Sequence, residues 1–322
     1  MKTCVITGCA GFIGSNLCDF LLSKNWVVKG IDNLVTGKIE FINNALENKN
    51  FTFYEEDLLT TNKLNKIFEN TDFVFHFAAN ADVRFGIDNP YRDFRQNTEV
   101  TLRILEAMKN CNVPNIVFSS TGSVYGEASV IPTPENHPFP IQTSMYGASK
   151  VAAEGFITSF SEAYGIKSWI FRFVSILGER YSHGHVYDFI YKLHQDPHNI
   201  EILGDGNQRK SYLNVKDCVL AINHAINSDA NLVNIYNLGT DDYCKVDESL
   251  TWICQELNLN PKRSYTGGER GWIGDNPFIY LDTNKIKSLG WAPKSNIKQS
   301  IIETVQYLIK NQWVFDNMEI KS

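Results

Sequence analysis

The sequence predicts an α/β protein built on a doubly wound parallel sheet, with a smaller interleaved α+β domain. Two observations predict the sheet: short runs that are apolar throughout alternate with longer helical patterns, and a glycine-rich turn follows the first of these runs. Strands that are apolar along their whole length are buried on both faces, and parallel neighbours need right-handed crossovers. With 322 residues, of which 43% are hydrophobic, the chain can bury a large core.

The expected elements follow one another in a regular order. Strands are expected at 4–7, 27–32, 73–78, 115–120, 168–173 and 234–239. Helices are expected at 12–25, 63–70, 91–111, 146–164, 248–259 and 296–311. After about residue 174 the pattern becomes charged and is punctuated by Pro and Gly. We therefore expect one domain over 1–174 plus about 210–243, and a second over about 175–209 and 244–322.

Charge and cysteine content exclude several classes of protein. The net charge is −6, so nothing indicates binding to nucleic acid or to an anionic membrane. The seven cysteines are scattered without a CxxC motif, so neither a disulfide framework nor a metal site is expected. No stretch approaches 18 uninterrupted apolar residues, so no membrane span is expected, and a cytoplasmic location follows by default.

The turn after the first strand has the features of a phosphate-binding loop. In CVITGCAGFIGSNL, Gly8, Gly11 and Gly14 lie between a strand and a helix. Glycine lets backbone N–H groups approach a pyrophosphate, and a helix N-terminus favours negative charge. Asp32, at the end of the next strand, is placed to accept from a ribose hydroxyl and would repel a 2′-phosphate, which favours NAD over NADP. The alternative is a structural turn that binds no ligand.

Other segments at strand ends fit the same cofactor. Asp57 and Leu58 follow a further strand, between those at 27–32 and 73–78, where they would cap an adenine edge. HFAAN at 76–80 supplies small residues where a sheet approaches a cofactor. Taken singly, these features are also explained by packing. The remaining candidates for cofactor contacts are Phe12, Ile13, Asn33, Phe77, Ala78, Ala79 and Ser119.

A tyrosine and a lysine share one face of the helix that begins at Tyr146. Lys150 lies four residues on, and residues at i and i+4 are neighbours on a helix. A nearby ammonium stabilises a phenolate and lowers the tyrosine pKa from its ordinary value of about 10. Such pairs are common by chance, so the companion FSSTGSVYGE matters: it follows a strand and brings Thr121 and Ser123 to the carboxyl edge of the sheet, where ligands bind.

These motifs together resemble the extended short-chain dehydrogenase/reductase family. The resemblance rests on Gly8, Gly11, Gly14, Asp32, HFAA, SSTGSVYG and YGASK, and it extends from residue 1 to near 310. More closely, the chain is similar to nucleotide-sugar epimerases of the UDP-glucose 4-epimerase type. The resemblance implies a Rossmann-type first domain that binds NAD and a second that binds the nucleotide sugar. The implied reaction oxidises C4 to a 4-keto sugar and reduces it again, with UDP-glucose/galactose or the N-acetyl forms as leading substrates.

The resemblance also implies roles for individual residues. Tyr146 would be the base, Lys150 would tune its pKa and anchor the cofactor ribose, and Thr121 would relay the proton, with Ser123 close by. The implied neighbours of the nicotinamide are Asn97 and Phe173. The implied substrate contacts are Thr121, Ser123, Ser175, His185, Arg209, Lys210, Arg270 and Asp275, with His185 in a loop and the cations near the diphosphate.

Two departures from the family pattern bear on the reaction. Ser175 stands where the family commonly has an asparagine that touches the substrate, so the sugar or nucleotide contact can differ. The sugar 4,6-dehydratases carry an Asp-Glu pair after the catalytic threonine, where this sequence has Gly122 and Ser123, and this favours epimerisation. The alternatives are a C4 dehydrogenase or dehydratase that releases a keto sugar, from GDP- or CDP-linked hexoses or heptoses, and a non-catalytic NAD-binding regulator.

The resemblance implies a homodimer as well, because this family commonly dimerises through a four-helix bundle. The helices at 91–111 and 146–164 would pair with those of the partner. Candidate contacts are the apolar residues Leu102, Leu105, Phe156 and Phe160, which core packing explains equally well.

Overall fold

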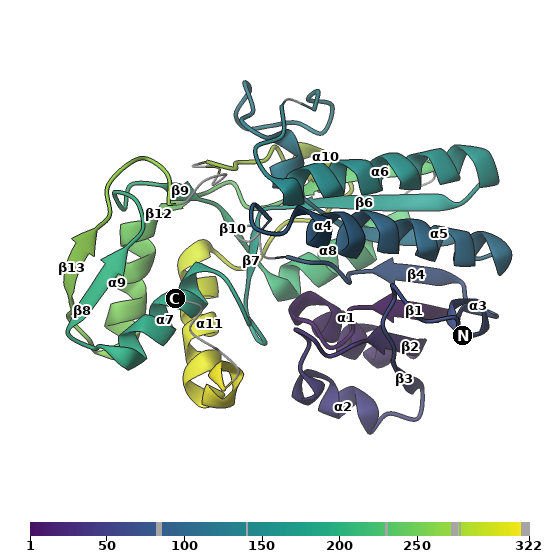
Figure 1. Cartoon of the computed structure of the whole chain (residues 1–322), viewed down its shortest axis with the longest axis horizontal. Coiled ribbons are helices and arrows are strands. Elements are labelled where there is room, and N and C mark those ends of the chain that lie inside the picture. Colours follow the sequence, from purple (N-terminus) through teal and green to yellow (C-terminus); the bar gives the residue numbers. More distant parts are fainter. Residues whose placement is uncertain (82–85, 140, 229–230, 272–275, 277, 317–322) are drawn as a thin grey trace.

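The fold is organised around a parallel sheet (Figure 1). A computed structural model describes residues 1–81, 86–139, 141–228, 231–271, 276 and 278–316, and within these ranges the sheet has seven strands. In their order across the sheet they are β11 (Val233–Leu238), β6 (Lys167–Phe173), β5 (Asn115–Thr121), β4 (Phe73–His76), β1 (Thr3–Thr7), β2 (Val27–Asp32) and β3 (Phe51–Glu55). The order runs outward from β1 to β3 and resumes on the other side of β1 with β4. The sheet is therefore doubly wound, which confirms the predicted fold class.

Helices cover both faces of the sheet. On one face, α1 (Phe12–Ser23) and α8 (Val215–Ser228) pack together. On the other face, α3 (Leu64–Phe68), α5 (Val100–Asn110) and α6 (Met145–Tyr164) form the second layer. The sheet is thus enclosed between two hydrophobic layers, as expected for parallel strands.

Alternate side chains of each strand belong to different layers of the core. In β1, Ile6 belongs to the cluster that includes α1 and α8, whereas Val5 belongs to the cluster with α5 and α6. In β6, Phe171 and Ile170 divide in the same way. All four side chains are fully buried, which explains why the apolar residues of these strands are consecutive and not confined to every second position.

The carboxyl ends of the central strands line up at one edge of the sheet. In the register, Thr7 pairs with His76, His76 with Phe118, and Thr121 with Phe173. β1 and β4 thus end level with Phe118, and β5 and β6 continue to Thr121 and Phe173, so the loops after all four strands open at the same edge. Many of the residues predicted to bind cofactor and substrate lie in these loops or next to them.

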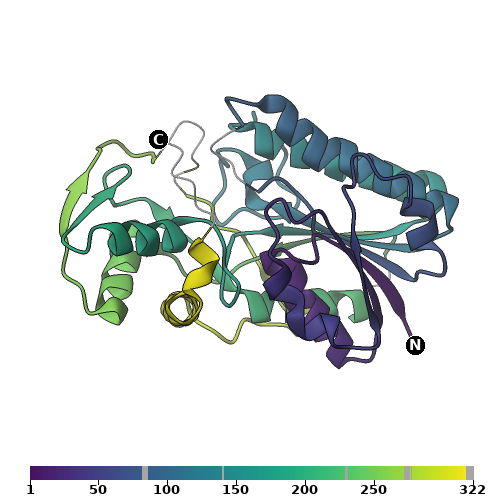
Figure 2. The ribbon, with the colours of Figure 1, turned by 60° about the horizontal axis from the view of Figure 1, so that its bottom comes forward.

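A smaller α+β part lies beside the sheet, on the left in Figure 1, and Figure 2 shows it from a second direction. Its helices α7 (His185–Gln195), α9 (Val246–Leu257) and α11 (Ile297–Lys310) pack against one another. Its short strands pair as β8 (Asn199–Ile202) with β13 (Lys262–Tyr265), β9 (Arg209–Lys210) with β12 (Cys244–Lys245), and β7 (Ser175–Leu177) with β10 (Tyr212–Asn214). The chain returns to the large sheet through α8 and β11, so the two parts are interleaved.

The long helix predicted at 91–111 is present and contains a π-helical segment near its start. The chain forms α4 (Pro90–Asp93), then the π-helical η2 (Phe94–Glu99), and only then α5. The wider π-turn brings two consecutive side chains to face α6. Asn97 Nδ2 donates to Ser149 Oγ at 2.9 Å, and Thr98 Oγ1 donates to the main-chain oxygen of the same serine at 3.0 Å.

The strand predicted at 73–78 is shorter than expected. It ends at His76, because the main-chain amides of Phe77 and Ala78 turn to donate to Thr7 Oγ1, each at 3.2 Å. The remaining short helices are η1 (Ile39–Ile42), α2 (Asn43–Leu46), η3 (Gly122–Tyr125), α10 (Asn284–Ser288) and η4 (Gln312–Phe315). Within the described ranges, no helix has both the length and the apolar character needed to cross a membrane.

Candidate active site

The glycine loop between β1 and α1 forms a cradle without room for side chains. Gly8 has a φ of 71°, and a Cβ there would lie 2.7 Å from the main-chain nitrogen of Ala78. A Cβ on Gly14 would lie 2.0 Å from the main-chain oxygen of Gly8, and one on Gly11 would lie 3.2 Å from that oxygen. Strand, loop and helix therefore approach one another as closely as a dinucleotide-binding turn requires.

Helix α1 directs its first amides at this cradle. Gly11 is the N-cap residue, and in the described part of the chain no side chain caps the helix there, so the amides of Phe12 and Ile13 lie at an uncapped N-terminus. Such amides and the helix dipole favour an anion. The donor set and the tight glycine loop thus fit the pyrophosphate of NAD.

Asp32, at the end of β2, presents a carboxylate to the same loop. One oxygen accepts from the Ala10 amide at 3.0 Å and the other from the Leu34 amide at 2.9 Å, and the residue is buried. Burial raises the pKa of Asp32, and these amide hydrogen bonds oppose the rise. Lone pairs remain on both oxygens, so this fixed carboxylate can still accept from ribose hydroxyls.

The predicted adenine contacts lie together beyond Asp32. Asn33 Nδ2 donates to Asp57 Oδ2 at 3.0 Å, and Asp57 Oδ1 accepts from the Leu59 amide at 2.7 Å. Leu58 is buried in the α5 and α6 layer of the core. These contacts fix the loop after β3 beside the loop after β2, so one wall of the site is preformed.

The loop after β4 closes the other side of the glycine cradle. Residues 77–79 are half-buried, and Ala78 lies against Gly8. Behind the loop, the buried His76 ring contacts Thr7 Oγ1 at 2.8 Å and Thr101 Oγ1 at 3.0 Å. Burial lowers the pKa of His76 to about 3, so this imidazole is neutral and structural.

Asn97 links the loop after β4 to the helix that carries Tyr146. Its Oδ1 accepts from the Asn80 amide at 2.8 Å, and its Nδ2 donates to Ser149 Oγ at 2.9 Å. Ser149 Oγ in turn donates to the main-chain oxygen of Tyr146 at 2.8 Å. Asn97 is 1% exposed, so it is an interior cross-link and not a residue of the helix surface.

Thr121 and Tyr146 meet at the carboxyl edge of β5. Thr121 ends the strand and caps η3: its Oγ1 accepts from the Ser123 amide at 3.1 Å and donates to Ser123 Oγ at 3.2 Å. The Thr121 side chain also acts on the phenol of Tyr146. Burial of the phenol raises the pKa of Tyr146 to about 12; the Thr121 side chain lowers it and the charge of Asp93 raises it.

Lys150 is buried one helical turn from Tyr146. Its Nζ donates to the main-chain oxygen of Ser119 at 2.8 Å and lies 4.6 Å from the centroid of the Phe118 ring. Burial lowers the pKa of Lys150 to about 7, and the charge of Glu154 opposes this. The lysine is thus anchored to β5. For Tyr146, burial is the dominant influence on the pKa.

Phe173 and Ser175 flank the same edge of the sheet. Phe173 ends β6 beside Thr121 and is buried, whereas Ser175 opens β7 and is exposed. Gly122 is enclosed: a Cβ there would lie 2.5 Å from Ile279 Cγ2 and 3.3 Å from the Phe173 oxygen. The position at which dehydratases carry an acidic side chain is therefore packed against the smaller part of the chain.

Two predicted substrate cations occupy successive positions of β9 and make different contacts. The Arg209 guanidinium carbon lies 3.9 Å from the centroid of the Phe278 ring. Lys210 Nζ donates to the main-chain oxygen of Asn276 at 3.0 Å, and the Asn276 side chain donates to the main-chain oxygen of Gly126 just after η3. Lys210 is thus connected to the turn that carries Thr121, while Arg209 stacks on an aromatic ring.

The third cation, Arg270, contacts the same turn from another segment. It forms an ion pair with Glu127, and both side chains are about half exposed. Two of the three predicted cations are therefore joined to residues 126–127, although long stretches of sequence separate them. Asp275, also predicted to contact the substrate, lies outside the described residues.

His185 is the first residue of α7, which corrects the prediction that it lies in a loop. The apolar spacing that marks this helix is readable in the sequence at the buried residues Val186, Phe189, Ile190 and Leu193. The ring nitrogens contact Tyr212 Oη at 2.6 Å and Ser249 Oγ at 2.7 Å. Burial and the charge of Lys210 lower the pKa of His185 to about 3, so the ring is a neutral hydrogen-bonding group.

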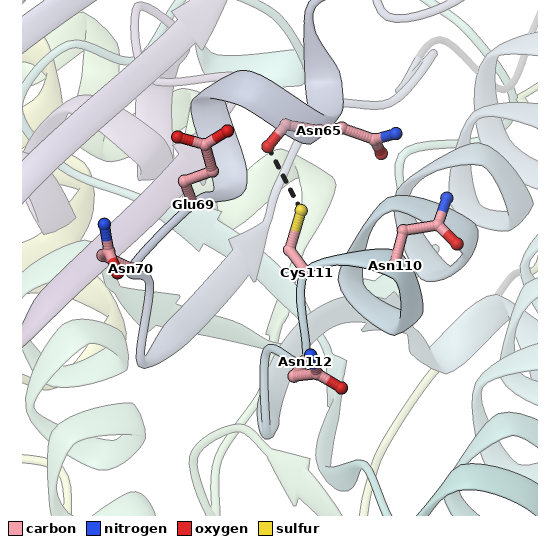
Figure 3. Close-up of a pocket in the computed structure, with 6 residues that line it drawn as sticks. All are labelled: Asn65, Glu69, Asn70, Asn110, Cys111 and Asn112. Atoms are coloured by element: carbon pink, nitrogen blue, oxygen red, sulfur yellow. Dashed lines mark hydrogen bonds between the residues drawn. The ribbon is translucent and has the colours of Figure 1, made fainter.

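A cavity of about 480 Å³ lies at the opposite, amino-terminal edge of the sheet (Figure 3). It is lined by Asn65, Glu69, Asn70, Asn110, Cys111 and Asn112, and the Cys111 thiol points to the main-chain oxygen of Asn65 at 3.1 Å. None of these residues was predicted to bind cofactor or substrate. Among the described residues, no group of three or more His, Cys, Asp or Glu is arranged to hold a metal ion.

Comparison with known sequences agrees with this geometry. The model of the NAD dependent epimerase/dehydratase family matches residues 4–239. The chain is 36% identical to a putative UDP-glucose 4-epimerase of Methanocaldococcus jannaschii, over 95% of this chain and 98% of the relative. It is 29% identical to a UDP-glucose 4-epimerase of Mycolicibacterium smegmatis, over 95% of this chain and 98% of that one.

Solved structures give the same result. A crystal structure of UDP-galactose 4-epimerase matches with a TM-score of 0.86 and 33% identity, covering 97% of this chain and 100% of that one. UDP-glucuronic acid 4-epimerase from Bacillus cereus, solved with UDP-glucuronic acid and NAD, matches with a TM-score of 0.89 and 26% identity, over 96% and 99% of the two chains.

Proposed function

The chain belongs to the NAD dependent epimerase/dehydratase family, and from this premise we propose that it inverts the configuration at C4 of a UDP-linked sugar. NAD is the cofactor. UDP-glucose and UDP-galactose, or their N-acetyl forms, are the leading substrates. The observation that carries the proposal is the placement of Thr121, at the end of β5, with Tyr146 and the buried Lys150 of α6, which is bonded to Ser119 of the same strand, at the edge of the sheet where the glycine cradle also lies.

The glycine cradle and its neighbours would hold the dinucleotide. The uncapped amides at the start of α1 would bind the pyrophosphate, and Asp32 would accept from the adenosine ribose hydroxyls. Asn33, Asp57 and Leu58 would border the adenine. At the nicotinamide end, the loop at 77–79, Ser119, Asn97 and Phe173 would form the walls. When bound, NAD supplies the acceptor and donor of the hydride at C4 of the sugar.

Tyr146 would take and return the proton of the sugar 4-hydroxyl. Its phenol, with a pKa of about 12, needs stabilisation of the phenolate to act near neutral pH. Two neighbours would supply it: Thr121, whose side chain lowers this pKa, and Lys150, by its ammonium charge one helical turn away on α6. Ser123, bonded to Thr121, would orient the 4-hydroxyl toward the phenol.

The smaller part of the chain would bind the rest of the substrate. Lys210 and Arg270 would bind the diphosphate, together with Arg209 and the neutral ring of His185, and Ser175 would face the sugar. We accordingly assign NAD binding to residues 1–174 plus about 210–243, and nucleotide-sugar binding to about 175–209 and 244–322. The enclosed position of Gly122 supports epimerisation over dehydration, because an acidic side chain there would collide with Ile279.

The protein would act as a homodimer through α5 and α6. Phe156 and Tyr164 on α6 are 39% and 49% exposed, which leaves apolar rings on the outer face of that helix. Leu105, by contrast, is fully buried in the core and is removed from the expected contacts. Light scattering should give twice the mass of the 36.6 kDa chain, and Phe156→Glu should yield monomers. A monomeric wild type would contradict this arrangement.

A panel of nucleotide sugars tests the proposed activity. The purified protein is incubated with NAD and UDP-glucose, UDP-galactose, UDP-N-acetylglucosamine or UDP-glucuronic acid, and products are followed by NMR and mass spectrometry. We expect at least one sugar to reach an equilibrium of C4 epimers with unchanged mass. Loss of water, or accumulation of a keto sugar with NADH, would instead show a dehydratase or a dehydrogenase. Tyr146→Phe should bind NAD but show no turnover.

A further inference from the structure

Glu154 is a buried carboxylate one helical turn beyond Lys150 on α6. It is 3% exposed and Lys150 is 1% exposed. Arg172, on β6, donates to Glu154 Oε2 from Nη2 at 2.7 Å and to Oε1 from Nε at 3.1 Å. Ser120 Oγ also donates to Oε1. Both carboxylate oxygens are thus satisfied in a site with almost no contact with water.

Arg172 extends this contact to the far end of the catalytic turn. Its Nη1 donates to Tyr125 Oη at 2.7 Å and to the main-chain oxygen of Glu135 at 3.0 Å, and Tyr125 Oη donates to Asn237 at 2.9 Å. Tyr125 is the last residue of η3, and Ser120 immediately precedes Thr121. Glu154 and Arg172 therefore hold both ends of the turn that presents Thr121.

The charges around Lys150 make Glu154 its principal counter-charge. Arg172 on β6 is a second cation, and His76 on β4 is neutral because burial lowers its pKa to about 3. On its own helix, Tyr146 is a neutral phenol whose pKa is raised to about 12. Asp93 on α4 acts on Tyr146. Among the described residues, Glu154 is the carboxylate whose charge opposes the lowering of the Lys150 pKa by burial.

We propose that Glu154 is a positioning residue for the reaction, which keeps Lys150 charged inside the buried site and, through Ser120 and Arg172, holds the turn that carries Thr121. The inference rests on the proposed function. Stability alone does not account for such a pair, because a buried ion pair is often no more stabilising than apolar residues of similar size. The position of the Glu154–Arg172 pair, one helical turn from Lys150 and in contact with the turn that carries Thr121, explains why an ion pair is buried here.

The pH dependence of kcat/KM separates this role from a purely structural one. Only charged Lys150 stabilises the phenolate, so activity is lost as pH rises through its pKa. Glu154→Gln keeps the size and an acceptor oxygen but removes the charge, so the alkaline limb should move to lower pH by about 1 unit. Glu154→Asp keeps the charge one methylene farther away and should move the limb less, in the same direction. Ser120→Ala, which leaves every charge in place, is the matched control and should lower kcat without moving the limb.

The outcomes are distinct. Suppose that the wild type turns over and that the alkaline limb of kcat/KM lies at the same pH in the wild type and in the Glu154 variants that fold. The inference is then overturned, while the proposed function stands. If wild type does not turn over, the proposed function fails, and a second readout still decides the inference. As pH rises, the Tm of a protein relative to that of its Lys150→Met derivative begins to increase at the folded-state pKa of Lys150. That onset should occur at lower pH in the Glu154→Gln background, and equal onsets would contradict the proposal.

Discussion

The Lys150 ammonium donates a hydrogen bond of 2.8 Å to the main-chain oxygen of Ser119, two residues before Thr121. One contact thus joins the helix that carries Tyr146 to the strand that ends at Thr121. It also holds the ammonium away from water, where burial lowers its pKa to about 7. The relation between phenol, hydroxyl and ammonium is set by the packing of α6 on β5.

The cost of burying this lysine should be visible in the pH dependence of stability. The pKa of Lys150 is lowered from 10.5 to about 7 in the folded chain, so between these values the unfolded chain binds more protons and stability rises with pH. Lys150→Met lacks this contribution. The Tm of wild type relative to Lys150→Met should therefore increase from pH 7 to pH 9, measured by scanning calorimetry. A difference that stays constant or falls would show that Lys150 is not a desolvated cation.

Removing the hydroxyl partner of Tyr146 should slow turnover. The Thr121 side chain lowers the pKa of Tyr146 against the effect of burial, so Thr121→Val should raise that pKa further. We expect kcat to fall about 100-fold or more, and the acid limb of the rate profile to move to higher pH. Thr121→Ser retains the hydroxyl and is the matched control. Equal activity of the valine and serine variants would exclude the relay.

The glycine cradle can be tested with two alanine substitutions of opposite outcome. A Cβ on Gly14 would lie 2.0 Å from the main-chain oxygen of Gly8, so Gly14→Ala should abolish NAD binding and lower Tm. A Cβ on Gly155, in the middle of α6, has no atom within 4 Å. Gly155→Ala should retain NAD affinity and gain about 0.5–1 kcal/mol of stability. Retained NAD binding in Gly14→Ala, measured by calorimetric titration, would contradict the assignment of the cradle.

Asp32 should set the choice of cofactor. Its carboxylate is fixed by the amides of Ala10 and Leu34 and would repel a 2′-phosphate. Asp32→Asn should weaken NAD binding and reduce the preference for NAD over NADP by about tenfold or more. A tenfold change in the ratio of the two dissociation constants corresponds to about 1.4 kcal/mol of binding free energy. The measurement is the ratio of the two Kd values. An unchanged ratio would place the ribose elsewhere.

Much of the fold could be predicted because its signals are local. Runs such as CVIT and FVFHFA are almost wholly apolar, and the glycine loop adds a turn that is typical of dinucleotide binding. The doubly wound sheet and its cofactor edge could therefore be predicted from the sequence. The comparisons confirm the resemblance to UDP-sugar 4-epimerases on which the function depends. The positions of the individual site residues on the cofactor and the substrate stay predictions.

The errors arose where tertiary contacts override local patterns. The π-helical segment within the predicted helix at 91–111 accompanies contacts of Asn97 and Thr98 with Ser149 of another helix, which no local spacing reveals. The ion pair of Glu154 could not be predicted either: its spacing from Lys150 is visible, but its partner Arg172 comes from β6. For the same reason, the burial that lowers the pKa of Lys150 could not be predicted from an i, i+4 spacing.

The most direct test of the central claim follows one hydrogen atom. The UDP-sugar that turns over in the panel is supplied with deuterium at C4, in ordinary water, and the epimer is examined by NMR. Because Tyr146 exchanges only the hydroxyl proton and the carbon-bound hydrogen stays with the bound cofactor, the account predicts that the product retains deuterium at the inverted carbon. Replacement of that deuterium by hydrogen from solvent, or inversion at a carbon other than C4, would contradict it.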